Sequence, residues 1–239
     1  MDWRDTGFVL TARRHGESAL IVELLTEAHG RHAGLVRGGQ SPKKRALLQP
    51  GNLVAVTWRG RLPEHLGVFE IELLRPHAAG LIDDPDRLAA LSSAAALIAL
   101  ALPEHEPHGD VFQELGALIA ALDSTGWPPR YVAWECALLA SLGFGLELSA
   151  CAATGVNDDL AYVSPRSGRA VSRSAGAPYH HKLLPLPDFL WRDAAAEPAD
   201  IVAGLALTGH FLHHHLLEPQ GRTLPEARAR LADRLRRLV

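Results

Sequence analysis

The chain has 239 residues, of which 47% are hydrophobic, and its formal net charge is −3. A chain of this length can bury the cores of one large domain or two smaller ones, and we expect two. No apolar run approaches the roughly 20 residues of a membrane-spanning helix, and the first residues, MDWRDTGF, lack the apolar core of a signal peptide. Because there are only two cysteines, the composition argues against a disulfide framework and favours a soluble protein of the cytoplasm.

Charge is distributed unevenly along the chain. Residues 1–80 carry 11 Lys+Arg and 8 Asp+Glu, a net of +3, whereas the remainder carries 13 and 19, a net of −6. The densest basic stretch is VRGGQSPKKRALLQPG at 36–51. The basic character therefore belongs to the N-terminal segment and not to the whole protein.

Five short apolar runs separated by glycine or proline predict an all-β unit at the N-terminus. The expected strands are Trp3–Arg14, Ser18–Thr26, Arg31–Val36, Asn52–Arg59 and Leu66–Arg75. In the last one, Phe69, Ile71 and Leu73 alternate with glutamates, which predicts one buried face. Five strands, with a polar KKR loop between the third and fourth, favour a closed Greek-key β-barrel of the OB type over residues 1–80.

Downstream, apolar residues recur every three or four positions, which predicts an α-helical domain over residues 81–239. We interpret Asp83, Asp84 and Asp86 as the start of its first helix rather than as a Mg²⁺ site. The fold class expected is therefore α+β and multidomain, with an irregular insert at 145–180. The expected helices begin at Pro85 and continue with Val111–Leu122, Arg130–Leu142, Ile201–Leu217 and Leu224–Leu238.

The insert resembles, in outline only, a pair of C-x-x-C metal knuckles separated by 17 residues that a known protein family carries. Only one of the four ligand positions holds a zinc ligand, because Thr, Ser and Ala offer nothing comparable to a thiolate or imidazole. We therefore expect no metal, and a plain β-hairpin with arms at 162–163 and 170–171 and the tip PRSGR. The residues at the four positions are Cys151, Thr154, Ser172 and Ala175.

Several stretches together resemble one known family over nearly the whole chain. They are GFVL, HGESALIVELLTEAHGR, VRG, KKR, the LQPG turn at Leu48–Gly51, the SPRSG hairpin and ALTGHFLHHH. This pattern, with a barrel placed before helices, resembles the RecO family of DNA-repair proteins, here with a degenerate zinc knuckle. The resemblance implies a nucleoid-associated recombination mediator, not an enzyme. Such a protein binds single-stranded and double-stranded DNA, anneals complementary strands, contacts the acidic tail of single-strand-binding protein, and with RecR helps to place RecA on gapped DNA.

The basic stretch is the expected DNA site. On an OB barrel, a cationic groove follows the phosphate backbone while aromatic rings stack on bases. Trp58, at a strand end, is the ring that we would test first for stacking. A solvated loop without a ligand stays open as the alternative for the charge run. The expected DNA-binding residues are Arg31, Arg37, Lys43, Lys44, Arg45, Trp58, Arg59 and Arg61.

The last helix is the expected protein-partner surface. Its arginines lie beside an apolar stripe, and such a groove suits an acidic peptide because guanidinium groups bind carboxylates in bidentate fashion. An arginine that merely covers core surface is an equally good interpretation. The residues expected to contact a partner are Leu224, Arg228, Leu231 and Arg234.

Catalytic motifs are absent from the sequence, and no cofactor is expected. The segment HFLHHH places His210 and His214 one helical turn apart, with His213 beside them, but no glutamate lies between them as in H-E-x-x-H zinc sites. We interpret these rings as helix surface that packs and forms hydrogen bonds, and a hydrolase built on them has the least support. The remaining alternative function is an adaptor whose barrel binds protein rather than DNA.

Overall fold

The computed structural model describes residues 1–62 and 65–237. It divides the chain into two compact units, one formed by Met1–Ala120 with Pro225–Arg228 and the other by Ala121–Leu224 with Ala229–Val239. The division falls well after the domain boundary predicted at residue 80, because two long helices pack with the barrel. Within the described ranges, none of the helices combines the length and apolar character that a bilayer crossing requires.

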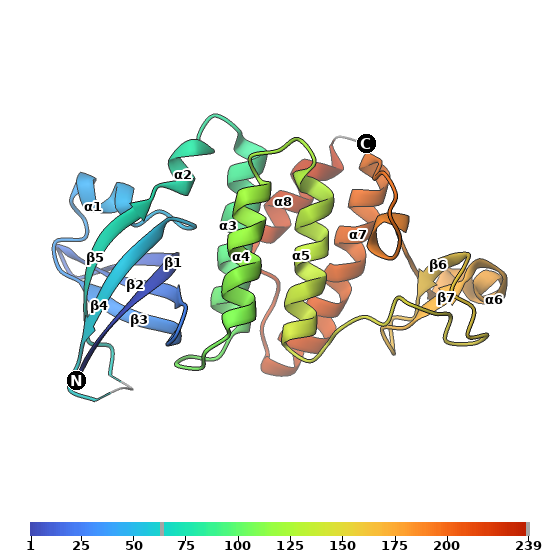
Figure 1. Ribbon diagram of the computed structural model, residues 1–239, viewed down its shortest axis with the longest axis horizontal. Coiled ribbons are helices and arrows are strands. Elements are labelled where there is room, and N and C mark those ends of the chain that lie inside the picture. Colours follow the sequence, from blue (N-terminus) through green and yellow to red (C-terminus); the bar gives the residue numbers. More distant parts are fainter. Residues whose placement is uncertain (63–64, 238–239) are drawn as a thin grey trace. The chain divides into compact units, whose positions relative to one another are not determined.

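The first unit contains a closed β-barrel with the strand order β1-β2-β3-β5-β4 (Figure 1). Strand β1 pairs with both β2 and β4, which closes the barrel. All neighbours are antiparallel except β3 and β5, which are parallel. This order is that of an OB-type Greek-key barrel, as predicted. The strands are β1 Asp2–His15, β2 Ala19–Thr26, β3 Gly30–Val36, β4 Leu53–Arg59 and β5 Val68–Arg75.

Alternate residues of each strand fill the barrel. On β3, the inward position Gly34 leaves room for an aromatic ring, since a Cβ there would lie 2.5 Å from the Phe69 side chain. Phe69 is accordingly buried, but Leu73 on the same strand is 41% exposed. The prediction that Leu73 is buried is wrong: it pairs with Val54 in phase with Phe69, but it lies near the end of β5, next to a shift in the β4–β5 register.

The KKR segment, predicted as a loop, folds as the short helix α1 (Pro42–Leu47). Proline suits the first helical turn because its missing N–H would have no partner there. None of the α1 residues is buried. The helix therefore has no apolar period from which it could be predicted.

Helices α2 (His77–Gly80), α3 (Pro85–Ala101) and α4 (Gly109–Ala121) complete the first unit. The Asp84 carboxylate accepts hydrogen bonds from the N–H groups of Asp86 and Arg87, both at 3.1 Å, which confirms its role at the start of α3. Helix α3 packs against β1. The rings of Phe8 and Phe112, with centroids 5.0 Å apart, join β1 to α4.

The second unit contains α5 (Trp127–Ser141) and α7 (Pro198–Phe211). Helix α5 starts before the predicted Arg130, because two prolines occupy its first turn. Gly204 of α7 allows close packing on α5, since a Cβ there would lie 2.7 Å from Val132. The Thr208 hydroxyl of α7 donates a hydrogen bond to the buried Glu135 carboxylate of α5. Helix α8 (Glu226–Arg236) follows near the end of the chain.

The insert forms a small sheet with the strand order β7-β6-β8. The one-turn helix α6 (Arg173–Gly176) directly follows β7 in the chain. Its pairing of Tyr162 with Val171 and of Val163 with Ala170 confirms the predicted hairpin. The sulfur of the buried Cys151 accepts a hydrogen bond from the Ser172 N–H at 3.2 Å, which links the two halves of the degenerate knuckle. The strands are β6 Leu160–Val163, β7 Ala170–Ser172 and β8 Leu184–Pro185.

Candidate nucleic-acid interface

The strand register brings cationic residues from separate strands to one edge of the barrel. Arg14 of β1 pairs with Leu20 of β2, and Leu20 pairs with Val36 of β3. Neighbouring strands lie about 4.8 Å apart, so Arg14 is about 10 Å across the sheet from the end of β3, which Arg37 follows directly. Arg14 was not among the residues predicted from the sequence, where only the basic charge of the segment points to it.

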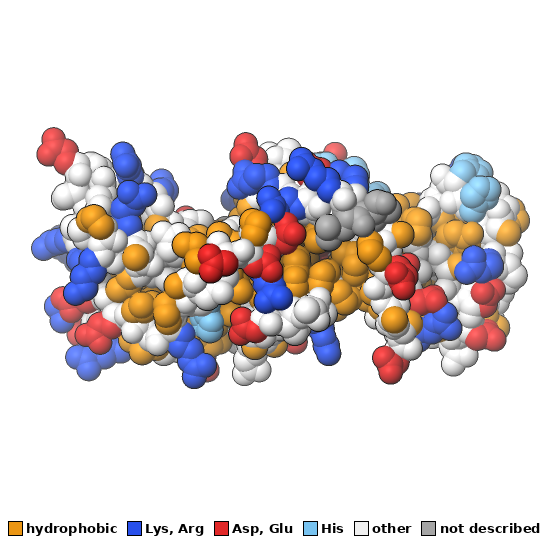
Figure 2. Space-filling model, turned by 90° about the horizontal axis from the view of Figure 1, so that it is seen from above, with side chains coloured by type: hydrophobic (Ala, Val, Ile, Leu, Met, Phe, Trp, Pro, Cys, Tyr) orange, Lys and Arg blue, Asp and Glu red, His pale blue; other side chains and the backbone are white. Residues whose placement is uncertain are grey.

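The same edge continues on the other side of β3. Leu35 pairs with Val68 of β5, and Val68 pairs with Arg59 of β4. Arg61 is exposed in the loop that follows β4. Helix α1, between β3 and β4, supplies the three cations of the KKR run. We call this set the basic edge: Arg14, Arg37, Lys43, Lys44, Arg45 and Arg59. Lys and Arg side chains gather over the barrel at the left of Figure 2, with carboxylates among them.

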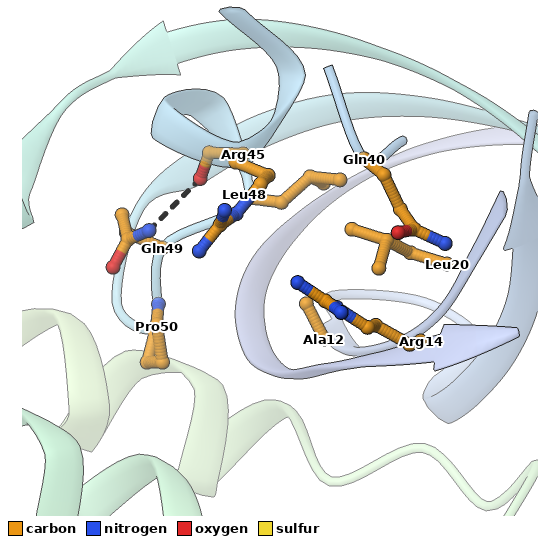
Figure 3. A pocket seen from close by; sticks show the side chains of 8 residues that line it. All are labelled: Ala12, Arg14, Leu20, Gln40, Arg45, Leu48, Gln49 and Pro50. Carbon is orange, nitrogen blue, oxygen red and sulfur yellow. Dashed lines mark hydrogen bonds between the residues drawn. The ribbon is translucent and has the colours of Figure 1, made fainter. Parts of the chain in front are cut away.

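A hollow of about 230 Å³ lies on the basic edge. Arg14 from β1 and Arg45 from α1 reach toward the same space (Figure 3). Two glutamines add amide groups to its wall, and the side-chain nitrogen of Gln49 donates to the Arg45 carbonyl at 2.9 Å. A hollow with this polar lining and two guanidinium groups suits an anion better than an apolar ligand.

A second, larger hollow of about 510 Å³ lies between α1 and β5. Arg37, Lys43 and Lys44 line one side, and the Lys44 ammonium donates to the Arg37 carbonyl at 2.6 Å. Glu70 lines the other side. Its carboxylate lies 3.0 Å from the Arg59 guanidinium. The negative charge of Glu70 is therefore balanced by this ion pair with Arg59.

The cations of the basic edge are available to a ligand. Arg14, Arg37, Lys43, Lys44 and Arg45 are all exposed. Across the described part of the chain, none of these five forms an ion pair with a carboxylate. Binding a phosphate would therefore require neither the rupture of an existing ion pair nor the burial of an unpaired charge. The structure thus brings five of the predicted cations together and adds Arg14.

Arg31 does not belong to this surface. It lies near the start of β3, about 20 Å from Arg37 at about 3.3 Å per residue. Its guanidinium lies 3.0 Å from the Glu23 carboxylate and 3.2 Å from that of Glu104, and its Nε donates to the Leu102 carbonyl at 2.9 Å. The side chain is 11% exposed. The structure therefore does not bring Arg31 to the basic edge, and its charge instead holds the segment after α3 against the barrel.

Trp58 cannot stack on a base, because its side chain is only 1% exposed. Its indole N–H donates to the Leu66 carbonyl at 3.2 Å. Gly67, with φ +59°, covers the ring so closely that a Cβ there would lie 2.2 Å from the indole nitrogen. No Trp, Phe or Tyr among the described barrel residues is exposed. The basic edge therefore offers charge without a stacking platform.

The predicted partner surface on the last helix is not an open groove. Arg228 is 4% exposed and Leu231 is fully buried, while Leu224 and Arg234 are half-buried. This burial disfavours Arg228 and Leu231 as contacts for an incoming peptide, and it agrees with the alternative of an arginine that covers core surface. Leu238, the last predicted member of the apolar stripe, lies outside the described residues.

Two family models match this chain, one over the barrel and one over the helical part. The family model for the N-terminal domain of recombination protein O matches residues 1–77, and the model for its C-terminal domain matches residues 82–224. The chain is 55% identical to the DNA repair protein RecO of Rhodospirillum centenum, over 99% of this chain and 96% of that protein. It is 53% identical to that of Rhodospirillum rubrum (99% and 97%) and 51% identical to one from Cereibacter sphaeroides (99% of both). The chain belongs to the RecO family.

Proposed function

We propose that this protein acts in DNA repair by binding the phosphate backbone of DNA along the basic edge. The observation that carries the proposal is the convergence of exposed cations from β1, β3 and α1 on two adjoining hollows, both lined by Leu48. Because no Trp, Phe or Tyr ring is exposed on the described barrel, we expect binding to depend on charge and to be indifferent to base sequence.

The relatives at 51 to 55% identity are named as DNA repair proteins, which supports the same role here. In the proposed mechanism the protein anneals complementary single strands and, together with RecR, helps to load RecA on gapped DNA covered by single-strand-binding protein. Neutralising phosphates on two strands at once lowers their mutual repulsion, so a basic surface without base readout suits annealing. No chemical step is assigned to the protein.

Salt dependence of oligonucleotide binding tests the proposed interface. The logarithm of single-strand affinity falls with the logarithm of salt concentration by about 0.7 per phosphate contact. Five contacts predict a slope of about 3.5, which is a loss of about two orders of magnitude between 50 and 200 mM NaCl. Fluorescence anisotropy with labelled single strands of two unrelated sequences measures both the slope and the expected indifference to sequence.

A triple variant with Lys43→Gln, Lys44→Gln and Arg45→Gln isolates the contribution of α1. None of these side chains is buried, so the fold should persist while the slope falls to about 1.4. The control replaces three exposed arginines of the second unit, Arg169, Arg173 and Arg192, by glutamine. Equal losses in the two triple variants would show that net charge, and not the basic edge, governs binding. Annealing of complementary strands, followed by energy transfer between dyes, should slow in the α1 variant alone.

Exposed leucines on the barrel favour a second function, protein docking. Leu73 and Leu74 at the end of β5 are 41% and 48% exposed, and Leu62 and Leu66 in the β4–β5 loop are 44% and 39% exposed. An adaptor that uses these side chains would bind its partner through apolar contacts, which salt weakens little. A Leu73→Ser, Leu74→Ser variant that keeps full DNA affinity and annealing but fails to support repair in cells would assign docking to this surface.

A further inference from the structure

The histidine-rich segment after α7 is not a regular α-helix. Residues Leu212–Leu217 form a π-helical turn, and the Glu218 N–H donates to the His213 carbonyl, five residues earlier. Such turns are rare and widen the helix locally. The rings of His210 and His214 still lie close together, with centroids 4.6 Å apart, but the wider turn changes which side chains follow them.

The wider turn brings a carboxylate to two imidazoles. His214 and Glu218 are four residues apart, and the Nδ1 of His214 lies 2.7 Å from a carboxylate oxygen of Glu218. His213 is five residues before Glu218 and would point about 140° away from it in a regular α-helix, but here the rings of His213 and His214 have centroids 4.7 Å apart. One ligand atom from each of His213, His214 and Glu218 lies within 4.8 Å of the other two.

The other two histidines of the segment are engaged elsewhere. His210 and His215 each place Nε2 3.3 Å from the Pro165 carbonyl oxygen. A ring nitrogen that donates to a carbonyl cannot bind a metal, so these two Nε2 atoms are excluded as ligands. The ligand atoms that do lie near one another belong to His213, His214 and Glu218, in place of the pair His210 and His214 suggested by the sequence.

We propose that His213, His214 and Glu218 bind a divalent transition metal ion of the Zn²⁺ class, with water completing the coordination. Two imidazoles and one carboxylate are ligands that Zn²⁺ accepts at about 2.0 to 2.2 Å, whereas Mg²⁺ and Ca²⁺ prefer oxygen alone. Ligand atoms around one tetrahedral zinc lie about 3.3 Å apart. The side chains of His214 and Glu218 are 47% and 59% exposed, so they can rotate to close the remaining distance.

The contact between His214 and Glu218 indicates how binding would depend on pH. A metal ion would take the place of the hydrogen that joins the Nδ1 of His214 to the Glu218 carboxylate, 2.7 Å away. Binding should therefore release protons and weaken as the solution is acidified.

Zinc titration of the full chain, purified without a polyhistidine tag, tests the site. Competition with a chromophoric chelator at pH 7.5 is expected to show one Zn²⁺ per chain. Glu218→Gln and His214→Ala should each weaken binding by at least about tenfold, a loss that even residues behind the ligands can cause. The matched control is His181→Ala, which removes an exposed histidine of the same unit and should leave the affinity unchanged. Co²⁺ should give the visible spectrum of a site with nitrogen and oxygen ligands and no thiolate charge-transfer band.

Cys151→Ser separates this site from the degenerate knuckle, where Cys151 is the remaining thiol. If Cys151→Ser abolished zinc binding and Glu218→Gln did not, the proposal would be wrong. It would also be wrong if the unaltered chain bound Zn²⁺ no more tightly than the His213→Ala, His214→Ala double variant. Thermal unfolding without metal checks that each variant is folded. If a histidine variant fails to fold, Glu218→Gln, which changes one exposed side chain, still tests the site.

Discussion

Protonation of His32 is expected to destabilise the first unit. The side chain is 3% exposed on β3, and its Nδ1 lies 2.8 Å from the Nδ1 of His105. Its Nε2 is buried without a hydrogen-bond partner, so the charged ring would bury an unsatisfied N–H donor. Burial, and then repulsion from His105 and His29, lowers the pKa of His32 from 6.5 to about 4.

The sign and size of the effect follow from the two pKa values. Because the folded-state pKa lies below that of the unfolded chain, the unfolded state binds more protons between pH 6.5 and 4, and stability falls as the pH is lowered through this window. Each pKa unit corresponds to about 1.4 kcal/mol, so the full loss is about 3 kcal/mol, of which about 2 kcal/mol has occurred by pH 5. With a urea dependence of about 2 kcal/mol per molar, the unfolding midpoint should drop by about 1 M between pH 7.5 and pH 5.

Urea unfolding at a series of pH values tests this expectation. The indole N–H signal of Trp58 in NMR spectra reports on the first unit alone, since Trp58 lies in the barrel core. In His32→Phe the midpoint should lose this part of its pH dependence, while His15→Gln, at an exposed strand end, should keep it. The reasoning fails if His32→Phe retains the full dependence, or if the His32 ring of the folded protein titrates near pH 6.5.

Three further predictions concern other buried groups. Trp58→Ala should lower the free energy of unfolding by about 3 to 5 kcal/mol, as measured by urea unfolding. The DNA affinity of the folded protein, measured by anisotropy, should not change. A loss of affinity without a loss of stability would instead support base stacking on Trp58. Arg31→Gln should cost about 1 to 3 kcal/mol of stability and leave the salt slope of DNA binding unaltered, whereas a lower slope would return Arg31 to the interface. Burial raises the pKa of Cys151, but hydrogen bonds from Ser172, Thr154 and the backbone outweigh it and lower the pKa from 9.0 to about 6. Thiolate absorbance should therefore appear near pH 6 and vanish in Cys151→Ser, and the stability that this thiolate contributes above pH 9 should be lost as the pH falls toward 6.

The barrel could be predicted from the sequence because its strands carry a strong local signal. Apolar runs bounded by glycine and proline gave all five strands, and their closed order matches the OB type. Helix α1 gave no such signal, since a six-residue helix without a buried side chain has no apolar face. The π-turn after α7 could not be predicted either, because the apolar residues of 201–217 have the three- and four-residue spacing of a regular α-helix.

The site was harder to predict than the fold because exposure and pairing depend on distant residues. Arg31 looks like its cationic neighbours in sequence, but Glu104, 73 residues away, takes up its charge. Arg14 shows the reverse case. It is remote from the KKR run along the chain, and only the register from Arg14 through Leu20 to Val36 brings it to the same edge.

The two corrections at the barrel lead to one conclusion about recognition. Its rings pack on each other, with Trp3 centred 5.8 Å from Trp58 and 6.2 Å from Phe69, so a base could reach the buried Trp58 or Phe69 only if the core opened. Exposing one buried tryptophan uncovers roughly 200 Å², which at about 25 cal/mol for each Å² costs about 5 kcal/mol, more than the roughly 1 to 3 kcal/mol that one stacked base returns. Contact between phosphates and cations that are already hydrated and exposed has a lower free-energy cost. Under the proposed function, a barrel built in this way would hold a DNA strand by its backbone and leave the bases free, which is the arrangement that pairing with a second strand requires.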